Sequence, residues 1–280
     1  MNSSHAPNPL VGEEKPIYVG SRNTDAMASP SHIEFLGITG SGKSTLARTA
    51  VRTIPDARIA KEAYLDSVLA GPISRVRPLL SRAPGRIKRN VIRAYPRLRN
   101  EPVYAYHDLS TEHPDFAETV ERIIKRIGVD EDERVRRLLI RRAVRYGVLM
   151  NEDVPMVFDE GFAMGAVTLF TRRGGTLEEP LIRQYMDAVP WPQILIQVDV
   201  DPEEGYQRAQ SRPDGLPSSI ARLPERVRRE RFEDMARCVT IIGDLAERRG
   251  TNVVRVDNTE ALSATKRTLS EEVDALIRST

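Results

Sequence analysis

Cysteine and long apolar runs are nearly absent from this 280-residue sequence. The one cysteine, Cys238, excludes an intramolecular disulfide and argues against a small metal site built from cysteines. No apolar run approaches the roughly 18 residues that a membrane-spanning helix needs. The first 30 residues also lack the basic-then-apolar order of a signal peptide. These absences favour a cytoplasmic protein.

A large net charge is missing too, because 42 Lys and Arg residues face 40 Asp and Glu residues. The whole molecule is therefore not a polycation, and any attraction to nucleic acid or to a membrane must come from a local patch. The N-K-x-D motif that reads guanine does not occur, which argues against a GTPase switch. The L-S-G-G-Q signature is also absent, which argues against an ABC-type ATPase.

Composition divides the chain into two parts. Residues 1–30 are rich in Pro, Ser, Asn and Gly and show no hydrophobic period, so we expect a flexible N-terminal segment. An arm that closes over a site is the functional alternative for this segment. Residues 31–280 are long enough for one large α/β core, and we expect them to form a single domain.

The most specific motif is GITGSGKS at Gly37–Ser44, which matches the phosphate-loop pattern G-x-x-x-x-G-K-[ST]. An apolar run that fits a buried strand precedes it, and the pattern predicts a helix after it. Its glycines let successive backbone N–H groups point at one polyphosphate. Lys43 supplies a positive charge to the outer phosphates, and the Ser44 hydroxyl is placed to ligate Mg²⁺. The residues expected to bind the nucleotide are Gly37, Thr39, Gly40, Ser41, Gly42, Lys43, Ser44, Thr45 and Asn258.

Residues 56–62 predict a weak second strand that ends in Glu62. In open parallel sheets, ligands bind beyond the carboxyl ends of the strands, so this carboxylate is a candidate general base. A solvated loop acid beside Lys61 is an equally good interpretation.

The stretch 71–99 carries nine Lys and Arg residues and no acid. It fits an anion-binding surface beside the phosphate loop, or a surface that docks acidic lipid or RNA. A solvated helical face explains the same charges without a ligand. Helical periodicity follows at 115–127 and at 132–150, with most arginines of the second helix expected on its polar side. We expect 71–150 to form a helical, Arg-rich insert on the substrate side.

A third strand is predicted where Val154–Phe158 runs into Asp159, Glu160 and Gly161. A carboxylate at this edge of the sheet is what a Mg²⁺-organising Walker B element requires, because it must lie beside the phosphate-loop serine. We therefore predict a metal site at Ser44 and Asp159. Glu160 is placed to orient or deprotonate the attacking group.

The last third of the chain predicts two more strands, at 193–199 and 252–256. Between them, Arg208 and Arg212 are four residues apart and share one helix face. We interpret residues 205–231 as an Arg-bearing lid that brings positive charge to a transition state. A salt-bridged surface helix is the structural alternative. Asn258 follows the final strand, where an adenine ring could pack.

The order of these features resembles the P-loop nucleoside and nucleoside-monophosphate kinase group, with thymidylate-kinase-like proteins nearest, over about residues 33–258. The resemblance implies a P-loop NTPase fold: a three-layer α/β sandwich with a five-stranded parallel sheet in the order 2-3-1-4-5. It also implies ATP, Mg²⁺ and a lid matched by Arg208 and Arg212. Those kinases commonly have Asp-Arg or Glu-Arg after the third strand, whereas this chain has Asp159, Glu160 and Gly161. This difference favours a neutral hydroxyl acceptor, such as a sugar, a nucleoside or a small metabolite.

We therefore expect an ATP- and Mg²⁺-dependent phosphotransferase that acts on a small-molecule acceptor. A partner-regulated ATPase that uses Glu160 to activate water is the first alternative, and a nucleoside monophosphate kinase is the second. Binding of nucleic acid or an acidic membrane through 71–99 is not favoured, and a homodimer is left open. The residues expected to take part in catalysis are Lys43, Glu62, Asp159, Glu160, Arg208 and Arg212.

Overall fold

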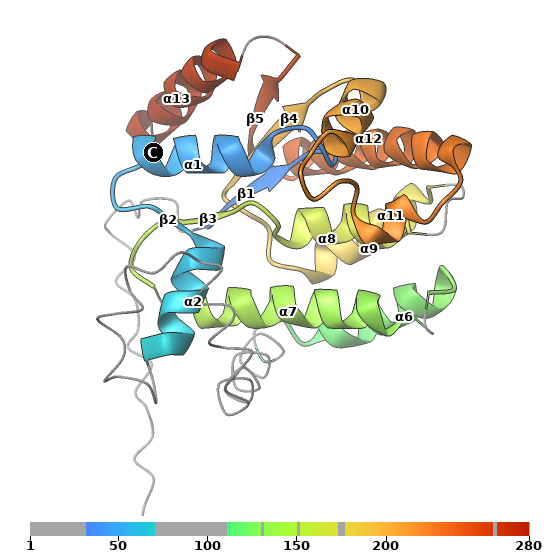
Figure 1. Ribbon diagram of the computed structural model, residues 1–280. Helices are drawn as coiled ribbons and strands as arrows, with labels where there is room; N and C mark the ends of the chain where they lie inside the picture. Colours follow the sequence, from blue (N-terminus) through green and yellow to red (C-terminus); the bar gives the residue numbers. More distant parts are fainter. Residues whose placement is uncertain are drawn as a thin grey trace, which may run out of the picture.

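The computed structural model describes residues 32–70, 111, 113–129, 132–149, 152–172, 177–259 and 262–279. The segment at 1–30 and the basic stretch at 71–99 lie outside the described residues. Figure 1 shows a central sheet with helices above and below it.

The sheet has five strands, all parallel, in the order β2-β3-β1-β4-β5. Its central strand, β1, pairs with both neighbours, so that Ile33 lies opposite Val157 on one side and Ile194 on the other. The predicted α/β class and strand order are therefore confirmed. The strands are β1 His32–Leu36, β2 Arg58–Ile59, β3 Met156–Phe158, β4 Ile194–Asp199 and β5 Asn252–Asp257.

Both faces of the sheet are covered, which explains why β1 is buried at every position. Ile33 and Phe35 point to the face that α1 (Lys43–Thr53) and α13 (Leu262–Ser279) cover. Leu36 belongs to the larger core on the opposite face. The helices over that face are α8 Phe162–Phe170, α9 Glu179–Ala188 and α12 Glu225–Arg248.

Two helices, α6 (Asp115–Arg126) and α7 (Glu133–Leu149), form a further layer outside α8 and α9 (Figure 1). They lie where the sequence predicts helices at 115–127 and 132–150. Next to α7 lies α2 (Ala60–Ala70), which follows the edge strand β2. Two short helices, α10 (Pro202–Gln210) and α11 (Ser218–Ala221), precede α12.

Two local predictions are wrong in their boundaries. The expected strand at 56–62 is only Arg58–Ile59, because α2 begins at Ala60 and includes Glu62 in its first turn. Ala60, Ala63 and Leu65 bury one side of this helix, and alanine and leucine are strong helix formers. The helix that the sequence predicts at 232–249 is α12, which begins at Glu225, seven residues earlier and directly after Pro224.

Among the described residues, none of the helices combines the length and the apolar composition that crossing a membrane requires.

Candidate active site

The loop between β1 and α1 turns sharply at two glycines. Gly40 and Gly42 have φ values of 91° and 89°, in the left-handed region that only glycine adopts easily. A Cβ at Gly40 would collide with the backbone of Gly205 in α10, and a Cβ at Gly42 would lie 2.6 Å from Asn258 Nδ2. The loop therefore packs closely against the start of α10 and the end of β5.

Lys43 begins α1 and folds back over this loop. Its Nζ donates hydrogen bonds to the carbonyl oxygens of Gly37 and Ile38, each at 2.6 Å. Burial lowers the pKa of Lys43 to about 8, with Glu160 opposing this shift, Arg212 adding to it and Asp159 opposing it. A nearby anion would favour the protonated form of this amine.

Ser44 and Asp159 are 115 residues apart in sequence, and the sheet brings them together. Because β1 and β3 are parallel neighbours, their carboxyl ends meet at the same edge. The Ser44 hydroxyl donates a hydrogen bond of 3.0 Å to Asp159 Oδ2. The two residues expected to hold a metal are thus in direct contact.

A cleft of about 360 Å³ opens between this pair and the loop. It gathers eight of the residues that the sequence singled out, together with Met164 of α8 and Pro217, which precedes α11. Glu160 is exposed beside Asp159, and Arg212 reaches the cleft from the end of α10. The described residues of the lining are Thr39, Gly42, Lys43, Ser44, Thr45, Asp159, Glu160, Met164, Arg212 and Pro217.

Six of the selected residues do not line the cleft: Gly37, Gly40 and Ser41, which belong to the loop itself, and Glu62, Arg208 and Asn258. Glu62 is exposed on α2 and does not line the cleft. Arg208 does not line it either, and forms an ion pair of 2.5 Å with Glu204 on its own helix. Asn258 is buried and donates a hydrogen bond of 2.7 Å to the carbonyl oxygen of Ser41, so that its amide supports the loop from behind.

Most arginines expected in the lid have partners within the described chain. Arg229 pairs with Glu203 and Glu225, and its guanidinium lies 5.1 Å from the centre of the Tyr206 ring. Arg226 pairs with Glu230 in the same helix. These contacts match the salt-bridged alternative, whereas Arg212 alone of this segment's arginines lines the described cleft.

Sequence reasoning missed Glu34, which is fully buried in the middle of β1. Its two carboxylate oxygens accept hydrogen bonds from the backbone N–H groups of Phe162 and Ala163, at 2.9 and 2.8 Å. The positive end of the α8 dipole stabilises this carboxylate. A Cβ at Gly161 would collide with it, which explains why glycine follows Asp159 and Glu160. The sequence signal that could have found Glu34 is a charged residue inside an apolar strand.

Arg142 was also missed, because the sequence pattern assigns it to the polar side of α7. The structure buries it, with 7% of its surface exposed. Its Nε and Nη1 atoms have no hydrogen-bond partner among the described residues. Burial lowers the pKa of Arg142, and the nearby Tyr185 and Glu160 oppose that shift. A buried guanidinium with two such nitrogen atoms is costly, so Arg142 is a candidate for a functional role near Glu160.

The donor atoms in the cleft fit a magnesium ion. Mg²⁺ prefers oxygen ligands and commonly takes one or two protein groups together with phosphate oxygens. A hydroxyl and a carboxylate, from Ser44 and Asp159, meet that description. Among the described residues, no group of three or more His, Cys, Asp or Glu side chains is arranged to hold a metal ion.

Comparison with known proteins finds no match for this chain, neither among family models nor among curated proteins.

Proposed function

We propose that this protein is a P-loop phosphotransferase that moves the γ-phosphate of ATP to a hydroxyl group of a small-molecule acceptor. The observation that carries the proposal is the contact of 3.0 Å between Ser44 and Asp159 beside Lys43. A phosphate-loop serine needs an acidic partner at the end of a neighbouring strand for magnesium–nucleotide chemistry. A glycine-rich turn without this chemistry needs no such partner.

Each residue of the cleft has a distinct task in this proposal. Backbone N–H groups of the loop bind the phosphates. Lys43 gives up its hydrogen bonds to the carbonyl oxygens of Gly37 and Ile38 and donates to phosphate oxygens instead. Ser44 and Asp159 would hold Mg²⁺, which when bound neutralises and orients the phosphates. Arg212, which follows α10, adds positive charge to the cleft.

Glu160 is the general base that the geometry favours over Glu62, because only Glu160 lines the cleft. The acceptor oxygen attacks the γ-phosphorus as the bond from that phosphorus to the β–γ bridging oxygen breaks. ADP is the leaving group, and the hydroxyl proton passes to the Glu160 carboxylate.

The test is ATP turnover with Mg²⁺ in the presence of alcohols, sugars, nucleosides and their phosphates, followed by ³¹P NMR. A new phosphoester signal, lost in Lys43→Ala and Asp159→Asn but kept in Lys61→Ala, supports the proposal. Lys61 is the matched control, because it is a half-buried lysine on α2 outside the cleft lining. Absence of nucleotide binding by the wild-type protein would overturn the proposal.

Hydrolysis is the second candidate, because Glu160 is exposed and accessible to water. Free phosphate without any phosphoester, rising when RNA, lipid or protein is added, would favour the partner-regulated ATPase.

A further inference from the structure

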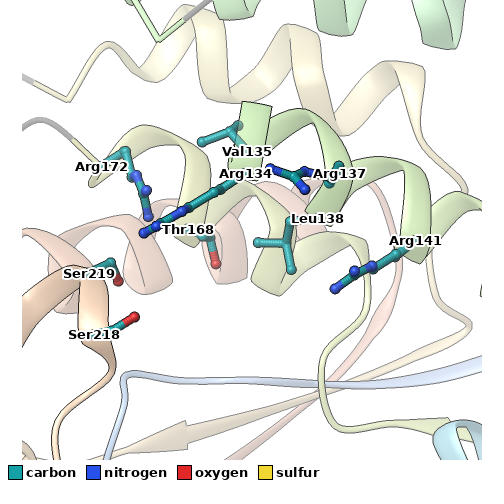
Figure 2. Close-up of a pocket in the computed structure, with 9 residues that line it drawn as sticks. All are labelled: Arg134, Val135, Arg137, Leu138, Arg141, Thr168, Arg172, Ser218 and Ser219. Atoms are coloured by element: carbon teal, nitrogen blue, oxygen red, sulfur yellow. The ribbon is translucent and has the colours of Figure 1, made fainter. Parts of the chain in front are cut away.

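A second pocket, of about 500 Å³, lies between α7, α8 and α11 (Figure 2). Four arginines line it: Arg134, Arg137 and Arg141 from α7, and Arg172 just after α8. In Figure 2, Ser218 and Ser219 of α11 lie across the pocket from the helix that carries Arg134 and Arg141. No acidic side chain is among the described residues that line this pocket.

The positive charge of the pocket is only partly balanced. Arg172 forms an ion pair of 2.6 Å with Asp132, and Arg137 pairs with Glu133 on its own helix. Neither Arg134 nor Arg141 has an acidic partner among the described residues. Within the described part of the chain, these two guanidinium groups are therefore available to bind an anion.

The positive charge of Arg172 also affects the pKa of a neighbouring arginine, Arg231. Arg231 of α12 is buried, and burial lowers its pKa to about 10, with the charge of Arg172 contributing in the same direction. An anion bound at Arg172 would relieve this repulsion.

The chemistry of the lining suits phosphate. Guanidinium groups bind phosphate oxygens through paired N–H donors, and serine hydroxyls add further donors. Arg134 and Arg141, whose charges no described acid balances, favour a dianion over a single carboxylate.

The pocket and the phosphate-loop cleft share two walls. Met164 of α8 lines the cleft, whereas Thr168, one turn further along the chain, lines the pocket. Pro217 lines the cleft, and the adjacent Ser218 and Ser219 line the pocket. At a rise of about 1.5 Å per residue, Thr168 lies ~6 Å from Met164 along the helix, and Arg172 is up to ~12 Å away. A molecule that spans this distance would contact both spaces.

We propose that this pocket binds a phosphate group of the acceptor, so that the acceptor is a phosphorylated alcohol whose free hydroxyl lies in the phosphate-loop cleft. This inference rests on the proposed function and narrows its substrate class. It replaces the neutral acceptor expected from the sequence. It also disfavours a nucleoside monophosphate whose own phosphate is attacked, because that phosphate would lie in the cleft beside Asp159 and Glu160.

The first experiment titrates inorganic phosphate into the full-length protein by calorimetry. We expect two sites in the wild-type protein. Arg134→Gln/Arg141→Gln should weaken one of them at least tenfold, and Lys43→Ala should weaken the other. The matched control is Arg267→Gln/Arg278→Gln, which removes two exposed charges from α13 and should keep both sites. Equal binding by the pocket variant and the control would overturn the inference.

The second experiment compares phosphorylated alcohols with their unphosphorylated parents as acceptors. The pocket variant should raise the KM for the phosphorylated acceptor at least tenfold and leave the KM for ATP unchanged. An equal preference of the wild-type protein for both acceptors would contradict the inference. If the proposed function fails instead, the site sensitive to Lys43 is lost from the wild-type titration, while the site sensitive to Arg134 and Arg141 remains. Ser218→Ala/Ser219→Ala provides a second pocket variant if the arginine variant does not fold.

Discussion

At the scale of single residues, the most informative side chain is Arg142, because its burial opposes stability. Two of its nitrogen atoms are buried without hydrogen bonds, and Glu160 lies within electrostatic reach. Structural need does not explain such a residue, since an apolar side chain of similar length would fill the same space at lower cost.

Arg142→Met is therefore expected to keep or increase the free energy of unfolding, by up to a few kcal/mol, while lowering kcat/KM at least tenfold. Urea unfolding and steady-state kinetics measure the two effects. Arg126→Met, at an exposed position of α6, is the control and should change neither quantity. A loss of stability in Arg142→Met with unchanged kinetics would assign Arg142 a purely structural role.

Lys43 gives a pH-dependent prediction. In the ligand-free protein its pKa is about 8, mainly because of burial, so the ammonium loses its proton as the pH rises through that value. A bound polyphosphate favours the protonated form, so binding above this pH takes up a proton. The affinity for Mg²⁺-ADP should fall between about pH 7.5 and 9.5, by at most about tenfold per pH unit. Titrations with a fluorescent ADP analogue measure this dependence.

Lys43→Ala should bind the same analogue more weakly and with an affinity that is nearly independent of pH in this range. A flat profile in the wild-type protein would show that the Lys43 amine does not control binding.

At the scale of elements, the loop after β1 packs closely against α10 because a glycine lies on each side of the contact. Gly40 and Gly205 approach so closely that a Cβ on Gly40 would collide with the carbonyl group of Gly205. This contact places the end of α10, and hence Arg212, at the cleft. A glycine also allows a close approach at the start of α8. There, the missing side chain of Gly161 leaves room for the Glu34 carboxylate, which accepts a hydrogen bond from the Phe162 N–H group.

Gly40→Ala and Gly250→Ala form a matched pair that isolates this contact. Both glycines have positive φ values, 91° and 84°, so both substitutions cost about 1–2 kcal/mol for the left-handed backbone. No atom lies within 4 Å of a Cβ at Gly250, whereas a Cβ at Gly40 collides with α10. Gly40→Ala should therefore lose more stability and weaken Mg²⁺-ADP binding at least tenfold, as thermal unfolding and titration would show. Equal losses in the two variants would mean that the loop and α10 separate easily.

At the scale of the whole molecule, the cleft depends on elements from distant parts of the chain. Ser44 follows β1, Asp159 follows β3, and Arg212 follows α10. A nucleotide bound there contacts the native arrangement only, because the unfolded chain cannot bring these groups together.

Mg²⁺-ADP at about one hundred times its Kd should therefore stabilise the wild-type protein by about 2.7 kcal/mol, which raises Tm by roughly 5–10 °C. Differential scanning fluorimetry measures this shift. Lys43→Ala at the same ligand concentration should show a much smaller shift, whereas Lys61→Ala should match the wild type. An equal shift in Lys43→Ala would mean that the nucleotide binds away from the loop.

Much of the site could be predicted because its signals are local. The glycine spacing of residues 37–42 reflects backbone angles, and the acid at Asp159 follows a recognisable apolar strand. Glu62 could not be assigned in this way, because strand and helix propensities compete over a few residues and the packing of α2 decides between them. Arg208 and Arg212 look alike in sequence, but α10 ends between them. Arg208 lies within the helix and pairs with Glu204, whereas Arg212 follows the helix and lines the cleft.

The sequence by itself determined the glycine-rich loop after β1, the acid at the end of β3 and the amphipathic helices, because each depends on residues that are close along the chain. The strand order 2-3-1-4-5 followed from a resemblance, and the structure confirmed it. Only the tertiary structure revealed the cap from Glu34, the burial of Arg142 and the arginine pocket. Each of these joins elements that are distant in sequence. Packing in three dimensions decides which side chains share one space, and no local pattern records that choice.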